Sequence, residues 1–137
     1  MSEPRVGCGA AIVKNGKILL MRRLKAPEAG CWGIAGGKVD LYETAAEAAR
    51  REIAEELGVA IAADELLCLV DQIDREAGDH WLSAVYLAER FVGEPRIQEP
   101  HKHEGLDWFD LSAPPEPLTA AAAAAIAALR ARGPVPA

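Results

Sequence analysis

The segment from Thr44 to Gly58 constrains the fold most, because it has the features of one well-bounded helix. It is rich in alanine, glutamate and arginine, which favour helix. Thr44 can cap the start, Glu47 completes a capping box, and Gly58 gives a stop signal. An apolar stripe runs along one side: Ala46, Ala49, Ile53 and Leu57. We therefore expect a helix over residues 44–57 that packs against a sheet.

Three glutamates lie along the edge of that apolar stripe. Glu52, Glu55 and Glu56 fall within about 100° of arc on a helical wheel, so they are neighbours. Two carboxylates about 4 Å apart repel by about 4 kcal/mol at an effective dielectric of 20, which favours a cation between them. All-oxygen ligands suit Mg²⁺ or Mn²⁺. A solvated acidic helix face is the alternative, because glutamate is common on helix surfaces.

The remaining pattern predicts strands followed by a second helix. Asn15-Gly16 separates two apolar runs and is the strongest short signal for a hairpin. The strands that we expect cover residues 6–13, 17–21, 32–35 (ending at Gly36-Gly37), 66–73, 81–91 and 106–109. A second helix is expected over residues 118–130, with Leu118, Ala122, Ile126 and Leu129 on one face. This order predicts an α/β (α+β) fold, a single domain over residues 1–137 with a mixed sheet between helices.

Charge and composition exclude several classes of protein. With 15 Lys+Arg and 21 Asp+Glu, the net charge is 15 − 21 = −6. That balance disfavours a binder of nucleic acid polymers or of anionic membranes, which would carry a basic face. The longest apolar run, residues 120–129, is too short to cross a bilayer.

The N-terminus and the cysteines both favour a cytoplasmic location. The first residues do not form a secretory signal. Cys8, Cys31 and Cys68 are odd in number and widely spaced, as is typical of reduced structural thiols.

The acidic helix belongs to a longer motif. Residues 37–43 (GKVDLYE), seven further residues, and residues 51–59 (REIAEELGV) match glycine, five residues, glutamate, seven residues, Arg-Glu, an aliphatic residue, any residue, Glu-Glu, any residue, glycine and an aliphatic residue. This pattern resembles the Nudix box. The resemblance implies a Nudix-type α/β/α sandwich and an enzyme that hydrolyses nucleoside diphosphate derivatives with Mg²⁺ or Mn²⁺.

The resemblance also implies a role for each residue of the box. Glu52 and Glu56 would be the principal metal ligands. Glu55 and the carbonyl of Gly36 would be further ligands. Glu43 and Arg51 would orient the cluster by hydrogen bonds and salt links. The base that activates water stays open between Glu52 and a carboxylate of a later loop.

Outside the box, the chain most resembles MutT-like nucleoside triphosphate pyrophosphohydrolases, which release a nucleoside monophosphate and pyrophosphate. That likeness implies phosphate contacts from Arg23 (or else Arg22 or Lys25) and Lys38. It also implies a metal-binding loop carboxylate, Glu104 or else Glu99. The partner would be a small nucleotide, and the protein a monomer or a homodimer.

Several alternatives remain open. The substrate could instead be ADP-ribose or a nucleotide sugar, although Arg75 and Ala77 depart from the residues typical of ADP-ribose and dinucleoside polyphosphate enzymes. A non-catalytic module that senses nucleotides is possible too. His101 and His103 could contribute to a transition-metal site or belong to a polar loop. Each of the tryptophans (Trp32, Trp81 and Trp108) could stack on a base or pack in the core.

Overall fold

The chain opens with the expected hairpin. In a computed structural model that describes residues 2–133, β1 (Arg5–Lys14) and β2 (Lys17–Arg23) pair antiparallel across the turn. Asn15 and Gly16 both have positive φ, 53° and 74°. Two successive left-handed residues match the twist of the flanking strands, which is why Asn-Gly predicts this turn.

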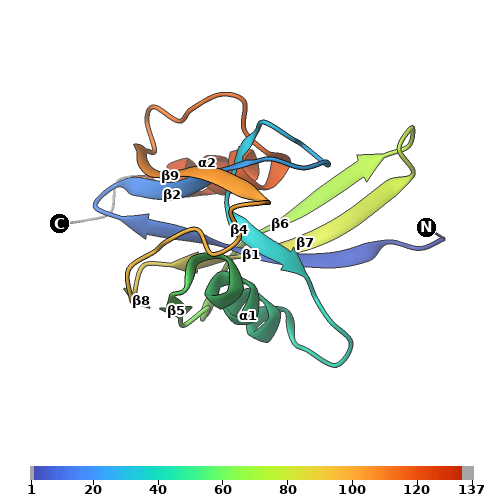
Figure 1. Cartoon of the computed structure of the whole chain (residues 1–137), viewed down its shortest axis with the longest axis horizontal. Coiled ribbons are helices and arrows are strands. Elements are labelled where there is room, and N and C mark those ends of the chain that lie inside the picture. The colour runs from blue at the N-terminus through green and yellow to red at the C-terminus, as the bar shows by residue number, and fades with distance from the viewer. Residues whose placement is uncertain (1, 134–137) are drawn as a thin grey trace.

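One mixed sheet forms the middle layer (Figure 1). Its strand order is β3-β2-β1-β7-β6, with β4 also paired to β1 and β9 to β2. β1 and β7 run parallel and the other pairs antiparallel, which confirms the predicted mixed sheet. The further strands are β3 (Trp32–Gly33), β4 (Ala35–Lys38), β6 (Glu65–Asp74), β7 (Asp79–Ala88) and β9 (His103–Asp110).

The two helices, α1 (Ala45–Leu57) and α2 (Ala120–Ala131), cover opposite faces of this sheet (Figure 1). Alternate residues of β2 show the two cores. Leu19 and Met21 pack in the cluster that contains Ile53 of α1. Leu20 packs in the cluster that contains Ile126 of α2. Side chains on a strand point alternately to the two faces, so this sheet is buried on both sides. The predicted α/β/α sandwich is confirmed.

Helix α1 begins and ends where the sequence predicts. The Thr44 hydroxyl accepts a hydrogen bond from the Glu47 amide (3.1 Å), and the Glu47 carboxylate accepts one from the Thr44 amide (3.4 Å). Gly58 ends the helix with a left-handed φ of 71°. Three of the four predicted stripe residues are buried, and Ala46 is partly buried against the same core.

Other boundaries differ from the prediction. The glycines Gly36 and Gly37 do not end a strand but lie within β4, since their lack of a side chain lets β4 pair closely with β1. The strand predicted over residues 81–91 ends at Ala88. Two short strands, β5 (Ala60–Ile61) and β8 (Phe91–Val92), pair with each other. Thr119 caps α2, so Leu118 precedes the helix.

The structure bears on the state of the cysteines and on the length of the helices. Cys8, Cys31 and Cys68 are all free thiols. Over residues 2–133, neither helix is both long enough and apolar enough to cross a membrane.

Candidate active site

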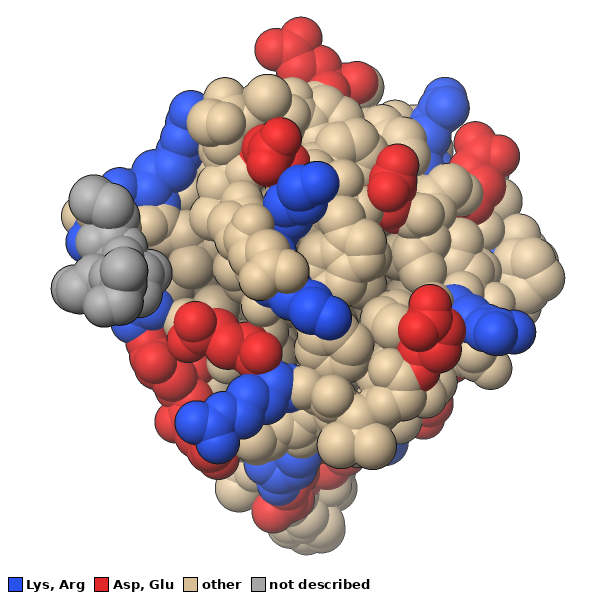
Figure 2. All heavy atoms as spheres, turned by 90° about the vertical axis from the view of Figure 1, so that its left-hand side faces the viewer, with Lys and Arg blue, Asp and Glu red and all other residues tan. Residues whose placement is uncertain are grey.

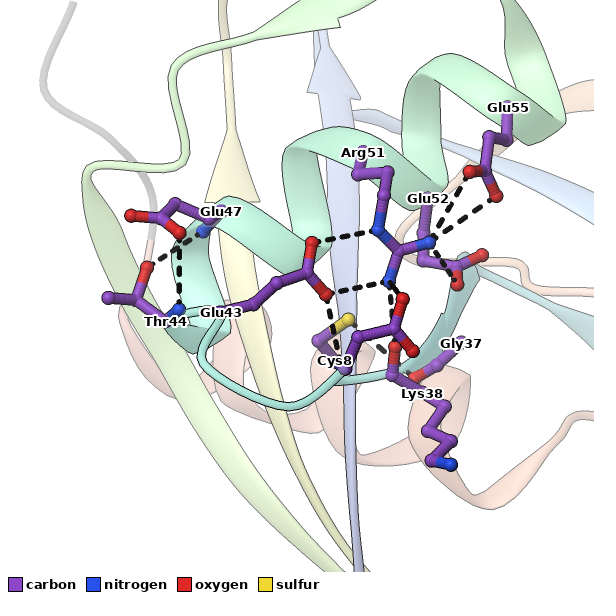
Figure 3. Close-up of polar contacts among 10 residues, drawn as sticks. Cys8, Gly37, Lys38, Glu43, Thr44, Glu47, Arg51, Glu52 and Glu55 are labelled. Atoms are coloured by element: carbon purple, nitrogen blue, oxygen red, sulfur yellow. Dashed lines mark hydrogen bonds and ion pairs between the residues drawn. The ribbon is translucent and has the colours of Figure 1, made fainter.

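Arg51 lies at the centre of the loop and helix that form the box (Figure 3). Its guanidinium donates two parallel hydrogen bonds of 2.8 Å to the carboxylate of Glu43. It also donates to Oε1 of Glu52 at 2.9 Å and to the carbonyl of Lys38 at 3.0 Å. Bidentate arginine–carboxylate pairs fix geometry as well as charge. Arg51 therefore ties the loop before α1 to the side chain of Glu52.

The same guanidinium sets the protonation of its partners. Hydrogen bonds from Arg51 lower the pKa of Glu43 from 4.5 to about 2. The bonds to Glu43 in turn raise the pKa of Arg51 above its ordinary value. Glu55 is more than half exposed and lies 3.4 Å from Arg51. This geometry suits the orienting role expected of Glu43 and Arg51.

Glu56 lies deeper than its neighbours. It is only 6% exposed, and one carboxylate oxygen accepts a 3.3 Å hydrogen bond from the Gly36 amide. Burial, together with the charges of Glu52 and Glu99, raises its pKa to about 8. Burial also raises the pKa of Glu52. The helix thus presents a graded edge, from buried Glu56 through partly buried Glu52 to exposed Glu55.

Gly36 and Gly37 leave room for this edge. A Cβ at Gly37 would overlap the Glu52 carboxylate, and a Cβ at Gly36 would overlap the backbone of Cys8. The Cys8 thiol donates to the Gly37 carbonyl at 3.6 Å, and burial raises its pKa to about 11. Cys8 therefore supports β4 as an uncharged thiol.

A hard divalent cation fits the donors that meet here. Glu52 and Glu56 supply carboxylate oxygens, and the Glu56 carboxylate is buried with a single amide donor, so a cation would compensate its charge. Within residues 2–133, no three carboxylate, imidazole or thiol side chains already converge as a metal site. Glu55 instead faces Arg51. Backbone, water and substrate oxygens can complete the coordination of Mg²⁺, which usually keeps several waters.

One of the two candidate carboxylates outside the box, Glu99, lies close enough to Glu56 for its charge to act there. The charge of Glu99 is among the causes that raise the pKa of Glu56, and Glu99 pairs with Lys102 at 3.1 Å. The Gln98 amide donates to the Glu56 carbonyl at 2.9 Å, which fixes the loop on α1. Glu104 lies across from β2, 3.6 Å from Arg22. The ligand roles of Glu104 and of its alternative Glu99 stay predictions, and it is the charge of Glu99 that acts on Glu56.

A cavity of about 350 Å³ opens beside the glycines of β4. Arg23 and Lys38 both line it, together with Gly36 and Gly37. The Arg23 guanidinium donates to the Pro27 carbonyl at 2.8 Å, and the Lys38 side chain points away from the carboxylates (Figure 3). The two predicted phosphate contacts and the glycines next to Glu52 and Glu56 therefore border one space.

The three tryptophans lie in two environments, one at the cavity and two in aromatic packing. Trp81 lines the cavity, with the Arg5 guanidinium 5.7 Å from its ring centroid. Trp32 packs edge-on against Phe109, with 5.0 Å between ring centroids, and Trp108 stacks on Phe91 at 6.1 Å, so both pack in the core.

His103 is buried, and burial lowers its pKa. No metal-binding group forms around it or His101 in the described part of the chain.

Comparison with known proteins agrees with this geometry. The NUDIX domain model matches residues 3–129. The chain belongs to the Nudix family of hydrolases. It is 34% identical over 110 residues to an ADP-ribose pyrophosphatase of Methanocaldococcus jannaschii, a match that covers 80% of this chain and 64% of that protein. It is 35% identical over 101 residues to a putative 8-oxo-dGTP diphosphatase 2 of Mycobacterium tuberculosis, covering 72% of this chain and 67% of that protein.

Solved structures extend the Nudix likeness to almost the whole chain. A MutT NUDIX hydrolase from Burkholderia pseudomallei superimposes with a TM-score of 0.91 at 55% identity, covering 93% of this chain and 99% of that one. The E. coli ORF135 protein superimposes with a TM-score of 0.74 at 29% identity, covering 98% and 96%.

Sequence reasoning missed most of the cavity. Its lining on the α2 side of the sheet comes from distant segments, including Arg5, Glu28, Gln72, Asp79 and Ser83. One local signal was available. Gly7 and Gly9 alternate on β1, and a Cβ at Gly7 would overlap the Ser83 hydroxyl, so the missing side chains leave room on one face of the strand.

Proposed function

We propose that this protein hydrolyses a nucleoside triphosphate to a nucleoside monophosphate and pyrophosphate, with Mg²⁺ or Mn²⁺. One observation carries the proposal. The buried Glu56 and its neighbour Glu52 lie at β4, whose glycines also line a cavity that contains Arg23 and Lys38. The carboxylates proposed to hold the cation and the side chains proposed to bind phosphate are thus grouped around the glycines of β4.

Positive and negative side chains have different roles in this proposal. Arg23 and Lys38 bind the phosphates and orient the polyphosphate of the substrate for in-line attack by water. Arg51 holds the Glu52 carboxylate in place, and Glu43 holds Arg51. A divalent cation held by Glu52 and Glu56 would lower the pKa of a bound water and neutralise charge on the phosphates. Glu55, the Gly36 carbonyl and Glu104 (or Glu99) are proposed as further ligands.

The charges on one face of the molecule are compatible with a small anionic substrate. On the face at the left of Figure 1, Lys and Arg alternate with Asp and Glu and form no continuous basic surface (Figure 2). That arrangement favours a small nucleotide over a nucleic acid polymer. We further propose a cytoplasmic monomer or homodimer, which cell fractionation and sedimentation would test.

A second candidate is hydrolysis of ADP-ribose or a nucleotide sugar. The archaeal relative, an ADP-ribose pyrophosphatase, supports it, whereas the mycobacterial relative supports a triphosphate. This chain matches only 64% of the length of the archaeal protein. A sensing module is the third candidate, but the intact pair Glu52 and Glu56 favours turnover.

A substrate panel tests the proposal. The protein is incubated with Mg²⁺ and triphosphates, ADP-ribose or nucleotide sugars, and products are separated by chromatography with pyrophosphate and phosphate assays. We expect pyrophosphate and a monophosphate from a triphosphate, and no product without Mg²⁺. Release of two monophosphates from ADP-ribose alone would favour the second candidate. Binding of nucleotide without any turnover would favour the sensor.

A further inference from the structure

Part of the cavity lining is rich in hydrogen-bond acceptors. Asp79, Trp81 and Ser83 alternate along β7 and belong to this part of the lining. Gln72 on β6 pairs in register with Trp81. Gly7 on β1 pairs with Ser83 and adds no side chain, so the space above the sheet stays open.

Glu28, in the loop between β2 and β3, also lines the cavity. One carboxylate oxygen accepts a 2.7 Å hydrogen bond from the Ala120 amide at the start of α2. The other accepts a 3.2 Å hydrogen bond from Nε2 of Gln72. Glu28 itself has a positive φ of 61°, which an L-residue rarely adopts. The Glu28 carboxylate is therefore held by β6 and α2, which are distant in sequence, and the residue keeps this position despite a strained backbone.

The bond between Glu28 and Gln72 also fixes which way the amide of Gln72 points. A carboxylate can only accept, so Gln72 must turn its NH₂ group to Glu28, which leaves its carbonyl oxygen to accept from elsewhere. A carboxylate has about four lone-pair sites, so Glu28 can take further donors as well. Asp79 adds a third acceptor to the cavity lining. The Arg5 guanidinium lies over the Trp81 ring.

We propose that Glu28 and Gln72 determine base specificity, and that they select a base with adjacent hydrogen-bond donors, the guanine type. Guanine presents a ring N–H next to an exocyclic amino group, which matches neighbouring acceptors. Adenine presents a ring acceptor beside its amino group and would leave one acceptor of the cavity facing another acceptor. A site built to hydrogen-bond one group discriminates strongly against an analogue without it. This inference rests on the proposed function, because it places the nucleoside of that substrate in the cavity.

GTP and ITP give the sharpest test, because they differ only in the 2-amino group. We expect wild-type protein to have at least a tenfold higher kcat/KM for GTP than for ITP, and a larger preference for GTP over ATP. In Glu28→Gln, the new amide can donate to Gln72, whose amide then turns its NH₂ towards the cavity. The GTP/ITP ratio should fall towards one. The control Glu76→Gln alters an exposed turn residue outside the cavity lining and should keep the wild-type ratio.

Folding is checked by thermal melting of each variant. Should Glu28→Gln not fold, Gln72→Ala removes one acceptor and keeps the bond from Ala120 to Glu28, and the ratio should again fall. An equal kcat/KM for GTP and ITP in the wild type, or an unchanged ratio in folded variants, would overturn the assignment of Glu28 and Gln72. Failure of the wild type to hydrolyse any triphosphate, with no shift in its melting temperature on adding one, would overturn the proposed function instead.

Discussion

The box around Arg51 and the cavity around Glu28 are built in opposite ways. The box takes its polar groups from one short stretch of chain, Lys38 to Glu56, and Arg51 binds four of its carboxylates. The cavity takes its lining from segments between Arg5 and Ala121, which meet only because β1 pairs with β7 and α2 returns to the sheet.

This difference indicates which residues affect the rate of the chemical step and which affect substrate specificity. Residues of the box depend on one another, so a change there affects the chemical step for every substrate. Most residues of the cavity lie outside the box, so they can change without disturbing the carboxylates that Arg51 binds. We therefore expect box variants to lower kcat uniformly and cavity variants to change KM and specificity.

The largest effect is expected from Glu56→Gln. The amide keeps the shape and can still accept from the Gly36 amide, but it removes the buried charge that would hold a cation. We expect kcat to fall on the order of 10³-fold for every substrate, since metal-ion stabilisation contributes several kcal/mol. Steady-state kinetics with several nucleotides measures this. Glu55→Gln, on the exposed side of the helix, should lose about tenfold or less. Equal losses in both variants would break the graded view of the helix edge.

The stability of the metal-free protein should depend on pH through Glu56. Its pKa is about 8 in the folded chain and near 4.5 in the unfolded chain, so folding favours the protonated acid. This contribution is fully present below about pH 4.5 and is lost as pH rises to about 8. Urea unfolding with a chelator should show a loss of a few kcal/mol across that window. The Glu56→Gln variant should flatten the curve, and an identical slope in both proteins would contradict the assignment.

Arg51→Lys tests whether the box acts as a unit. Lysine keeps the charge but cannot donate two parallel bonds to Glu43 while also reaching Glu52. We expect kcat to fall about 10–100-fold, in line with the loss of groups that orient metal ligands. Arg75→Lys, in the exposed turn between β6 and β7, is the matched control and should behave as wild type. A rise in KM with an unchanged kcat would instead show that Arg51 acts on substrate binding.

Gly7→Ala makes the opposite test on the cavity. The added Cβ would overlap the Ser83 hydroxyl and narrow the floor of the cavity. We expect KM to rise about tenfold with kcat little changed, because uniform binding is lost and the reacting groups are untouched. A matching melting temperature is needed for this interpretation. A large fall in kcat would show that the two regions are coupled.

The smallest effect is expected from Tyr42→Gly. Tyr42 is 94% exposed and has a positive φ of 72°, so its side chain gains little and its backbone is strained. Glycine removes the strain but loses more entropy on folding, so we expect a net gain of about 0.5–1 kcal/mol in unfolding free energy. Chemical denaturation measures it. A marked loss of activity would contradict this expectation, because it would show that the Tyr42 side chain takes part in binding or catalysis.

The sequence predicted the features that depend on neighbouring residues. The caps of α1, its apolar stripe and the order of its glutamates follow from helical spacing, and the Asn15-Gly16 turn follows from two residues. It did not predict β5 and β8, because two-residue strands have no periodic pattern. It ended a strand at Gly36-Gly37, because the close pairing with β1 that favours glycine there is a long-range contact.

The candidate site divides along the same line. The box residues could be named from spacing and family likeness, and their geometry is consistent with the roles expected. The cavity could not be assembled from the sequence, since Glu28, Gln72 and Ala120 are brought together only by the tertiary fold. Arg23 and Lys38 were expected to contact phosphate, but only the fold shows that both border one cavity.

Arg51 has one more consequence, for the order in which the protein is made and loaded. Its guanidinium already supplies a positive charge to Glu43, Glu52 and Glu55, and α1 has its own caps and core contacts. The box can therefore reach its shape on a newly synthesised chain before any metal arrives. A zinc finger, by contrast, acquires its structure from its ion. Binding of the proposed Mg²⁺ would then be a reversible exchange with free Mg²⁺ in solution, so activity would follow the Mg²⁺ concentration while the amount of folded protein stays constant.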